Sequence, residues 1–350
     1  MIKYKPKTFL LIALALIVSA CSTNIDINAP WRPITVVYGL LDQKDTIHYI
    51  RVNKAFLGDT SAYVMAQQAD SLIYNNVEVR LKKVNISTGN VVRTFVFTDT
   101  IINKDPGIFA TDKNKVYYYK GKILDDNESA KDFRYDLYVY VADRNKQITA
   151  STYLLDDVNI KNPPYTDYAS VNLTSQTPYK VIWETVARGR LYQLKMRFHY
   201  YEVTNTDTVE KYLDMTFPRL TSINDLGGQD LSSVISKETF LNFLANHIEE
   251  NPNIKRYVKK ETLDFYVYIG SNDTYKYMQI TNPSNSIVQD RPFFTNINGG
   301  VGLFSARTYT LRAGKKLERR SIDEIANNNI TRKLNFQDYE TSTYFWSNLK

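Results

Sequence analysis

The segment from residue 192 to residue 201 constrains the fold of this chain most strongly. One face carries Tyr192, Leu194, Met196, Phe198 and Tyr200, and the other carries Gln193, Lys195, Arg197, His199 and Tyr201. A period of two places successive side chains on opposite faces of a β-strand. The segment therefore predicts a strand with one buried and one wetted face, in a protein built around a β-sheet.

Other strand-like segments recur along the chain, separated by turn residues. They are residues 34–41, 47–53, 77–82, 91–98, 116–119, 135–141, 148–154, 181–183, 210–217 and 263–269. Residues 34–41 form a continuous apolar run, which predicts a buried strand, and residues 210–217 are the expected antiparallel partner of 192–201. This spacing predicts a mainly β protein of the sandwich type.

Residues 156–180 contain three prolines among polar residues and show no sustained periodicity. We interpret them as a linker. The chain then divides into an N-terminal β-sandwich domain, residues 34–155, and a C-terminal β-rich domain, residues 181–350.

Helices are expected at three places. Residues 62–70 are helix formers that suit one or two turns. Ser236 is a suitable N-cap for a helix over residues 237–249, with Pro252 beyond its end. Ser321 to Glu324 matches the capping box that opens a short helix.

The first residues have the pattern of an export signal. Lys3, Lys5 and Lys7 precede a short apolar core, Phe9 to Val18, which is too short to span a bilayer. Small residues then lead directly into Cys21, the only cysteine. This arrangement resembles the lipobox of bacterial lipoproteins, and the alternative is an ordinary signal peptide with an incidental cysteine.

The lipobox interpretation predicts the mature form of the protein. Residues 1–20 are removed as a signal peptide, Cys21 is acylated, and residues 21–33 form a tether to an outer membrane. The tether holds a single acidic residue, Asp26, so the periplasmic and the cell-surface face both stay open. A lipidated Cys21 leaves no thiol for a disulfide, a thiolate nucleophile or a cysteine-bound zinc ion.

Composition narrows the function further. The chain holds 27 Tyr and 16 Phe among 350 residues, and tyrosine suits half-exposed sheet faces. The formal net charge of +7 includes the lysines of the signal peptide, and the remaining basic residues lie in no recognisable nucleic-acid motif. We therefore expect no nucleic-acid partner.

No pattern in the sequence indicates a catalytic or metal site. His48, His199 and His247 lie far apart without metal-ligand spacing, and we interpret them as surface histidines. Asp125, Asn127 and Ser129 alternate as in a calcium loop. However, Ala130 occupies the glycine position, so a polar loop is predicted.

The glycine run and the tyrosines each allow a functional and a structural interpretation. Gly299 to Gly302 could bind an anion, but the context of a dinucleotide loop is missing, and a tight turn or bulge is favoured. Exposed tyrosines could stack on sugars or meet a protein partner, although cross-strand pairing is preferred. They are Tyr117, Tyr119, Tyr138, Tyr140, Tyr266 and Tyr268.

Four blocks of the sequence point to a family. They are Val37 to Leu41, Ala62 to Tyr74 leading into Val77, Trp183-Glu184 followed by Arg190 to Tyr201, and Arg291 to Phe304. Together they resemble exported lipoproteins of Bacteroidota that carry a domain of unknown function and are often encoded beside TonB-dependent outer-membrane receptors. The resemblance implies a β-rich, immunoglobulin-like envelope protein and assigns no catalytic or binding residue.

Two functions follow as hypotheses. The first is a non-enzymatic lipoprotein without cofactors that assembles with another envelope component, with a TonB-dependent receptor as the expected partner. The second is a surface lipoprotein that binds or processes glycans. A pair of carboxylates for glycoside hydrolysis is defined by its separation in space, so the sequence leaves that chemistry open.

Overall fold

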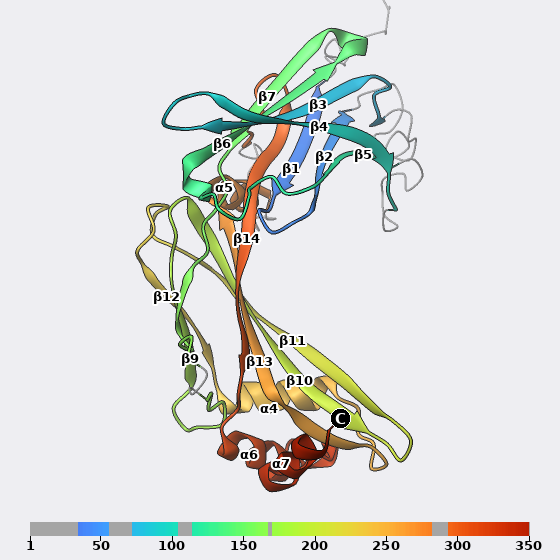
Figure 1. Ribbon diagram of the computed structural model, residues 1–350, viewed down its shortest axis with the longest axis vertical. Helices are drawn as coiled ribbons and strands as arrows, with labels where there is room; N and C mark the ends of the chain where they lie inside the picture. The colour runs from blue at the N-terminus through green and yellow to red at the C-terminus, as the bar shows by residue number, and fades with distance from the viewer. Residues whose placement is uncertain (1–33, 56–71, 104–113, 167–169, 282–292, 350) are drawn as a thin grey trace, which may run out of the picture.

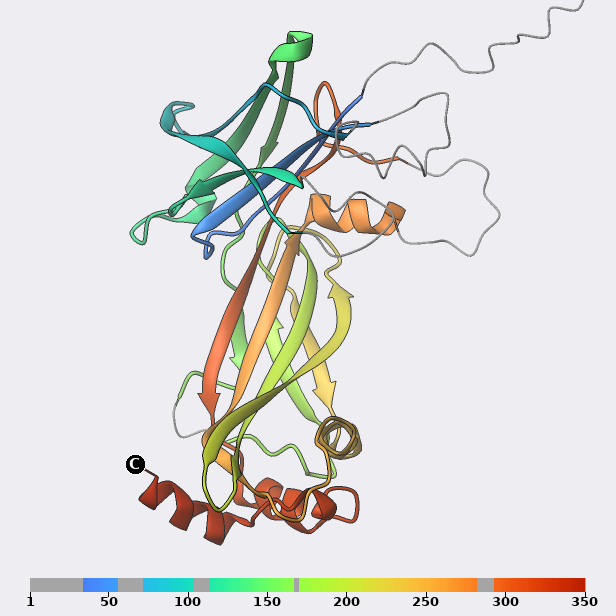
Figure 2. The same ribbon diagram turned by 90° about the vertical axis from the view of Figure 1, so that its right-hand side faces the viewer.

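The computed structural model describes residues 34–55, 72–103, 114–166, 170–281 and 293–349. Cys21, the tether and the expected helix at residues 62–70 lie outside these ranges. The described chain is mainly β, as predicted. It is elongated, with an upper part of curled strands and a lower part of long strands closed off by helices (Figure 1, Figure 2).

The upper part is formed by the first seven strands. They are β1 (Thr35–Leu41), β2 (Ile47–Lys54), β3 (Val77–Asn85), β4 (Val91–Ile101), β5 (Lys115–Lys120), β6 (Phe133–Val141) and β7 (Lys146–Thr152). They pair in the order β1-β2-β5-β4-β3-β6-β7. Alternate side chains of β6 are buried, which places one face of this curled sheet on a core.

The lower part is built from the remaining seven strands, four of which are long. They are β8 (Asn159–Asn162), β9 (Tyr179–Glu184), β10 (Gly189–Val203), β11 (Thr208–Thr221), β12 (Asp230–Ile235), β13 (Lys255–Ser271) and β14 (Val301–Lys315). β11, β10, β13 and β14 are hydrogen-bonded neighbours in that order, and β12-β9-β8 form a separate small sheet. The strand predicted at residues 192–201 and its partner at 210–217 are confirmed as β10 and β11.

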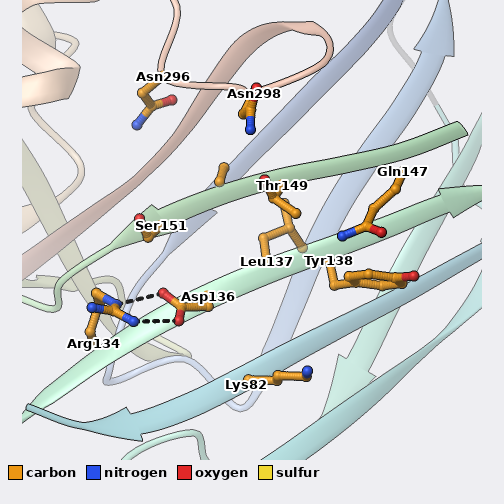
Figure 3. Close-up of a pocket in the computed structure, with 11 residues that line it drawn as sticks. Lys82, Arg134, Asp136, Leu137, Tyr138, Gln147, Thr149, Ser151, Asn296 and Asn298 are labelled. Atoms are coloured by element: carbon orange, nitrogen blue, oxygen red, sulfur yellow. Dashed lines mark hydrogen bonds and ion pairs between the residues drawn. The ribbon is translucent and has the colours of Figure 1, made fainter. Parts of the chain in front are cut away.

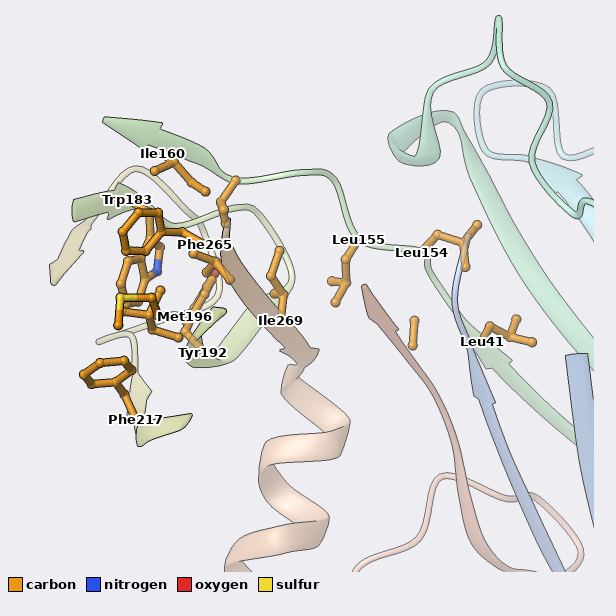
Figure 4. Packing of buried hydrophobic residues seen from close by; sticks show 14 of the residues in the cluster. Leu41, Leu154, Leu155, Ile160, Trp183, Tyr192, Met196, Phe217, Phe265 and Ile269 are labelled. Carbon is orange, nitrogen blue, oxygen red and sulfur yellow. The ribbon is translucent and has the colours of Figure 1, made fainter. Parts of the chain in front are cut away.

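The two sheets of the lower part enclose an apolar core. Tyr192, Leu194, Met196 and Phe198, predicted on the inner face of β10, are all fully buried. Figure 4 shows Tyr192 and Met196 packing with Trp183 of β9, Phe217 of β11 and Phe265 of β13.

One strand joins the two parts. β14 pairs with β13 in the lower part and runs parallel to β1 in the upper part, where Val36 lies opposite Val301. A single sheet within the described residues therefore extends from β11 to β7. The two expected domains, residues 34–155 and 181–350, are thus connected through the pairing of β1 with β14. Pairing between strands so distant in the chain leaves no local signal in the sequence.

The expected linker at residues 156–180 is also more structured than predicted. It contains β8 and buries Val158, Ile160, Val171 and Leu173. Val171 forms a parallel bridge with Leu317 beyond β14. Proline and polar residues are frequent here because the backbone changes direction repeatedly between these anchors.

Four α-helices lie in the described residues. They are α4 (Lys237–His247), α5 (Asn272–Thr281), α6 (Arg319–Asn327) and α7 (Tyr339–Asn348). Ser236 caps α4 as predicted, since its hydroxyl accepts a hydrogen bond from the Thr239 amide. The capping-box prediction is wrong, because α6 begins earlier and Ser321 is buried inside it, accepting a bond from the Leu173 amide.

Candidate binding surfaces

The structure separates the three histidines, as their spacing predicted, but not all lie at the surface. His48 is buried, its Nε2 lies 3.2 Å from the Gly121 carbonyl oxygen, and burial lowers its pKa. His199 is largely covered, with Nε2 3.0 Å from the Asp264 carboxylate. Only His247 is exposed, so the surface interpretation is wrong for His48 and His199. Both histidines are covered by residues of neighbouring strands. The local sequence does not reveal which residues these are.

The loop of Asp125, Asn127 and Ser129 is occupied by a protein cation. Glu128 forms an ion pair with Lys83, whose ammonium group is buried above the Phe133 ring at 4.1 Å. Glu128 also accepts a bond from the Asp125 amide. Burial acts against its charge, but these bonds outweigh it and lower the pKa of Glu128. The loop is thus a structural ion-pair site.

Gly299 to Gly302 form a tight turn into β14, as expected. Gly299 and Gly302 have φ of +81° and +121°, which L-residues rarely adopt. The preceding residue, Asn298, exchanges backbone hydrogen bonds of 2.8 and 3.1 Å with Thr149 of β7. The turn therefore lies between β7, which Asn298 bridges, and β1, which pairs with β14.

The tyrosines of the lower sheet pair with one another across strands. Tyr266 and Tyr268 contact Tyr309 of β14, with ring centroids 5.9 and 5.7 Å apart. The preferred cross-strand interpretation is confirmed for this set. Tyr117, expected at the surface, is instead 2% exposed because the sheet curls around it.

Charges on the same outer face are paired. Arg197 donates two hydrogen bonds of 2.7 and 2.8 Å to Asp214, and its guanidinium lies 3.9 Å from the centre of the Tyr212 ring. These bonds lower the pKa of Asp214 and raise that of Arg197. This part of the sheet is stabilised by contacts within the chain.

An outer face on β1 and β2 is mainly apolar. Tyr38 and Leu40 of β1 are 39% and 37% exposed, and Ile47 and Tyr49 of β2 are 38% and 44% exposed. The prediction of a buried β1 is therefore wrong for this face. The signal was present in the continuous apolar run of residues 34–41, which makes both faces of the strand apolar while the fold buries only one.

The same four residues line one shallow groove. Its volume is about 460 Å³, and Leu303, Val116 and Ile102 complete the apolar lining. At one border Tyr38 meets Tyr277 of α5, with the two hydroxyl oxygens 2.9 Å apart. Burial and this hydrogen bond raise the pKa of Tyr38 to about 12, so its hydroxyl stays neutral at physiological pH.

A second, polar groove lies over β6 and β7 (Figure 3). Its volume is about 570 Å³. The lining residues are Lys82, Arg134, Asp136, Leu137, Tyr138, Gln147, Thr149, Ala150, Ser151, Asn296 and Asn298. Sequence reasoning named Tyr138 but not its polar neighbours, which come from three segments far apart in the chain.

Two further features bear on function. Among the described residues, no group of three or more histidine, cysteine or acidic side chains is arranged to hold a metal ion. None of the helices in the described ranges has the length and apolarity needed to cross a membrane.

Comparison with known proteins identifies no family. No protein-family model matches the chain, and no curated protein matches it significantly. Among solved structures, CBD12 from CALX1.2 is 10% identical over 79% of this chain and all of that one, with a TM-score of 0.17. The C-terminal globular domain of an oligosaccharyltransferase from Pyrococcus abyssi is 9% identical over 82% of this chain, with a TM-score of 0.17, and the match spans 50% of that domain.

Proposed function

We propose that this protein is a non-enzymatic, lipid-anchored lipoprotein of the outer membrane that docks against another envelope protein. The apolar face of β1 and β2, defined by Tyr38, Leu40, Ile47 and Tyr49, is the proposed docking surface. By the family resemblance, the expected partner is a TonB-dependent receptor. The observation that carries the proposal is the exposure of these four side chains around one groove.

The composition of this face fits a protein partner. Contiguous apolar patches with a polar rim mark interaction sites, and burial of apolar area contributes about 25 cal/mol per Å². Tyrosine and arginine are enriched in protein interfaces. Here Tyr38 and Tyr49 line the groove together with Arg51 and Arg307.

Charged groups beside the groove can also select a partner, because the cation of Arg307 is only loosely paired with Asp42 and Asp45. Arg307 lies 3.8 Å from both Asp42 and Asp45, a separation that leaves its guanidinium available for a closer carboxylate. Burial raises the pKa of Asp42. A docking partner with an acidic side chain opposite Arg307 would meet a cation that is 55% exposed.

The test uses the full-length, lipidated protein with a C-terminal tag, extracted from its native membranes in mild detergent. We expect a TonB-dependent receptor to co-purify in a stoichiometric ratio. Leu40→Asp introduces a charge into the apolar face and should abolish recovery of the receptor. Leu226→Asp is the matched control, because Leu226 is 77% exposed in the loop between β11 and β12.

The result has two informative outcomes. Loss with Leu40→Asp and retention with Leu226→Asp supports docking at this face. Equal recovery with both variants, or a wild-type preparation without a receptor, contradicts the proposal. Circular dichroism and thermal unfolding of both variants separate loss of binding from loss of folding.

A further inference from the structure

The polar groove over β6 and β7 is bordered by a segment that hydrogen bonds hold in place. Its far wall is the segment before β14, which is fixed by the backbone bridge between Asn298 and Thr149. The Asn296 side chain strengthens this wall, donating to the Phe304 carbonyl at 2.6 Å and accepting from the Phe304 amide at 2.9 Å. The groove is therefore a preformed concavity between a strand face and an anchored loop.

Several hydrogen-bonding side chains in the groove have no partner within the described residues. Gln147, Thr149 and Ser151 point from the outer face of β7, and Asn298 lies across from them (Figure 3). Amides and hydroxyls both donate and accept. Such a set, spaced along one strand, matches the alternating hydroxyl groups of a sugar chain better than an apolar ligand.

An aromatic ring forms the floor beside these groups. Tyr138 of β6 lies between Lys82 and Gln147 in the groove (Figure 3). It is partly exposed, and it also lines a second concavity with Glu78, Arg80 and Tyr140. An exposed ring offers a flat apolar surface on which the C–H face of a pyranose can pack.

The charges in the groove leave one cation unpaired. Arg134 donates two hydrogen bonds of 2.7 and 2.8 Å to Asp136. In the neighbouring concavity Arg80 pairs with Glu78 at 2.9 Å. Lys82 has no carboxylate partner among the described residues, and its ammonium group lies 6.0 Å from the centre of the Tyr138 ring. A ligand with a carboxylate near the stacked ring would supply the missing partner.

We propose that this groove is a binding site for an acidic oligosaccharide. One uronic acid residue stacks on Tyr138 and pairs its carboxylate with Lys82. The hydroxyls of the same chain bond to Gln147, Thr149, Ser151 and Asn298. The site is separate from the docking surface on β1 and β2, so either can fail without the other.

Isothermal titration of the full-length protein in detergent tests the site. The probes are hexamers of galacturonate and of mannuronate, each beside its methyl ester, which has the same backbone without the charge. We expect one acidic hexamer to bind roughly three- to fivefold more tightly than its ester, as a partly exposed ion pair allows. Added salt should weaken that preference.

Variants assign the binding to the groove. Lys82→Met should remove the preference for acid over ester, whereas Lys211→Met, at an exposed lysine on β11, should keep it. Tyr138→Ala should weaken both forms about tenfold through lost ring packing, and Tyr344→Ala on α7 should not. Absence of binding by both acidic hexamers, an unchanged preference in Lys82→Met, or unchanged affinity in Tyr138→Ala overturns the proposal.

Discussion

Gly302 packs against the backbone of Val37 so closely that a Cβ atom at this position would lie 2.0 Å from the Val37 carbonyl oxygen. The two residues are partners in the parallel pairing of β1 with β14. This pairing joins the upper and lower parts of the molecule. A single glycine therefore permits the contact on which the continuous sheet depends.

Gly302→Ala should destabilise the protein strongly. The new Cβ would meet a backbone atom that cannot rotate away, and φ of +121° is unfavourable for alanine. We expect a loss of at least about 3 kcal/mol in the free energy of unfolding, measured by urea denaturation.

Gly89→Ala is the matched control for this prediction. Gly89 has φ of +70° in the turn between β3 and β4, and nothing lies within 4 Å of the position that a Cβ atom would take there. Only the backbone conformation is then unfavourable, so the expected loss is about 1 kcal/mol. Equal losses in the two variants would contradict a special role of the contact between Gly302 and Val37.

Arg256 should hold the C-terminal segment on the lower sheet. It is 2% exposed, its Nε donates to Glu202 at 2.9 Å, and its Nη1 donates to the Leu334 carbonyl at 2.7 Å. Arg256→Leu leaves both acceptors unpaired, and we expect a loss of about 3–5 kcal/mol in urea unfolding.

Lys333→Ala serves as the comparison for Arg256→Leu. The two side chains of its ion pair with Glu250 are 48% and 56% exposed, so its removal should cost less than about 1 kcal/mol. A similar, small effect of both substitutions would show that the buried pair does not anchor this segment.

Asp214→Asn should alter the acid stability of the protein. Bonds from Arg197 hold the pKa of Asp214 below its ordinary value of 3.8, so the carboxylate stabilises the fold above that pH. The contribution is lost as the pH falls through the lower folded pKa. The stability difference between wild type and Asp214→Asn should therefore be constant near neutrality and shrink below pH 3.8.

Glu78→Gln controls for removal of any surface carboxylate. The two side chains of its pair with Arg80 are 59% and 49% exposed, and the pair should contribute little at any pH. Thermal unfolding from about pH 7 to about pH 2 measures both variants against wild type. A stability difference for Asp214→Asn that stays unchanged across this range would contradict the assigned pKa shift.

Cys21→Ala should release the protein from the membrane. The lipoprotein prediction places two or three acyl chains at Cys21, and several chains are needed for stable attachment. Cell fractionation with a high-salt wash should move the variant to the soluble fraction, while Ser22→Ala stays with the membrane. Retention of Cys21→Ala in the membrane fraction would contradict lipid anchoring at this residue.

Local patterns determined the strands and one helix start. The alternation from Tyr192 to Tyr200 predicted which side chains of β10 are buried, because the period of two follows from backbone geometry alone. Ser236 predicted the start of α4, because a cap requires only neighbouring backbone groups. These features depend on contacts within a few residues.

Tertiary structure decided everything that depends on distant partners. Ser321 satisfies the local capping pattern, yet packing against Leu173 places it inside α6. The run from Ile34 to Leu41 predicted a strand, but only the pairing with β2 and β14 decided that Tyr38 and Leu40 face outward. The polar groove likewise arises where Asn298 meets Thr149, a contact between segments that no local pattern relates. Side-chain periodicity specifies whether a segment forms a strand or a helix. Which of its faces is buried depends on the free energy of packing in the complete core.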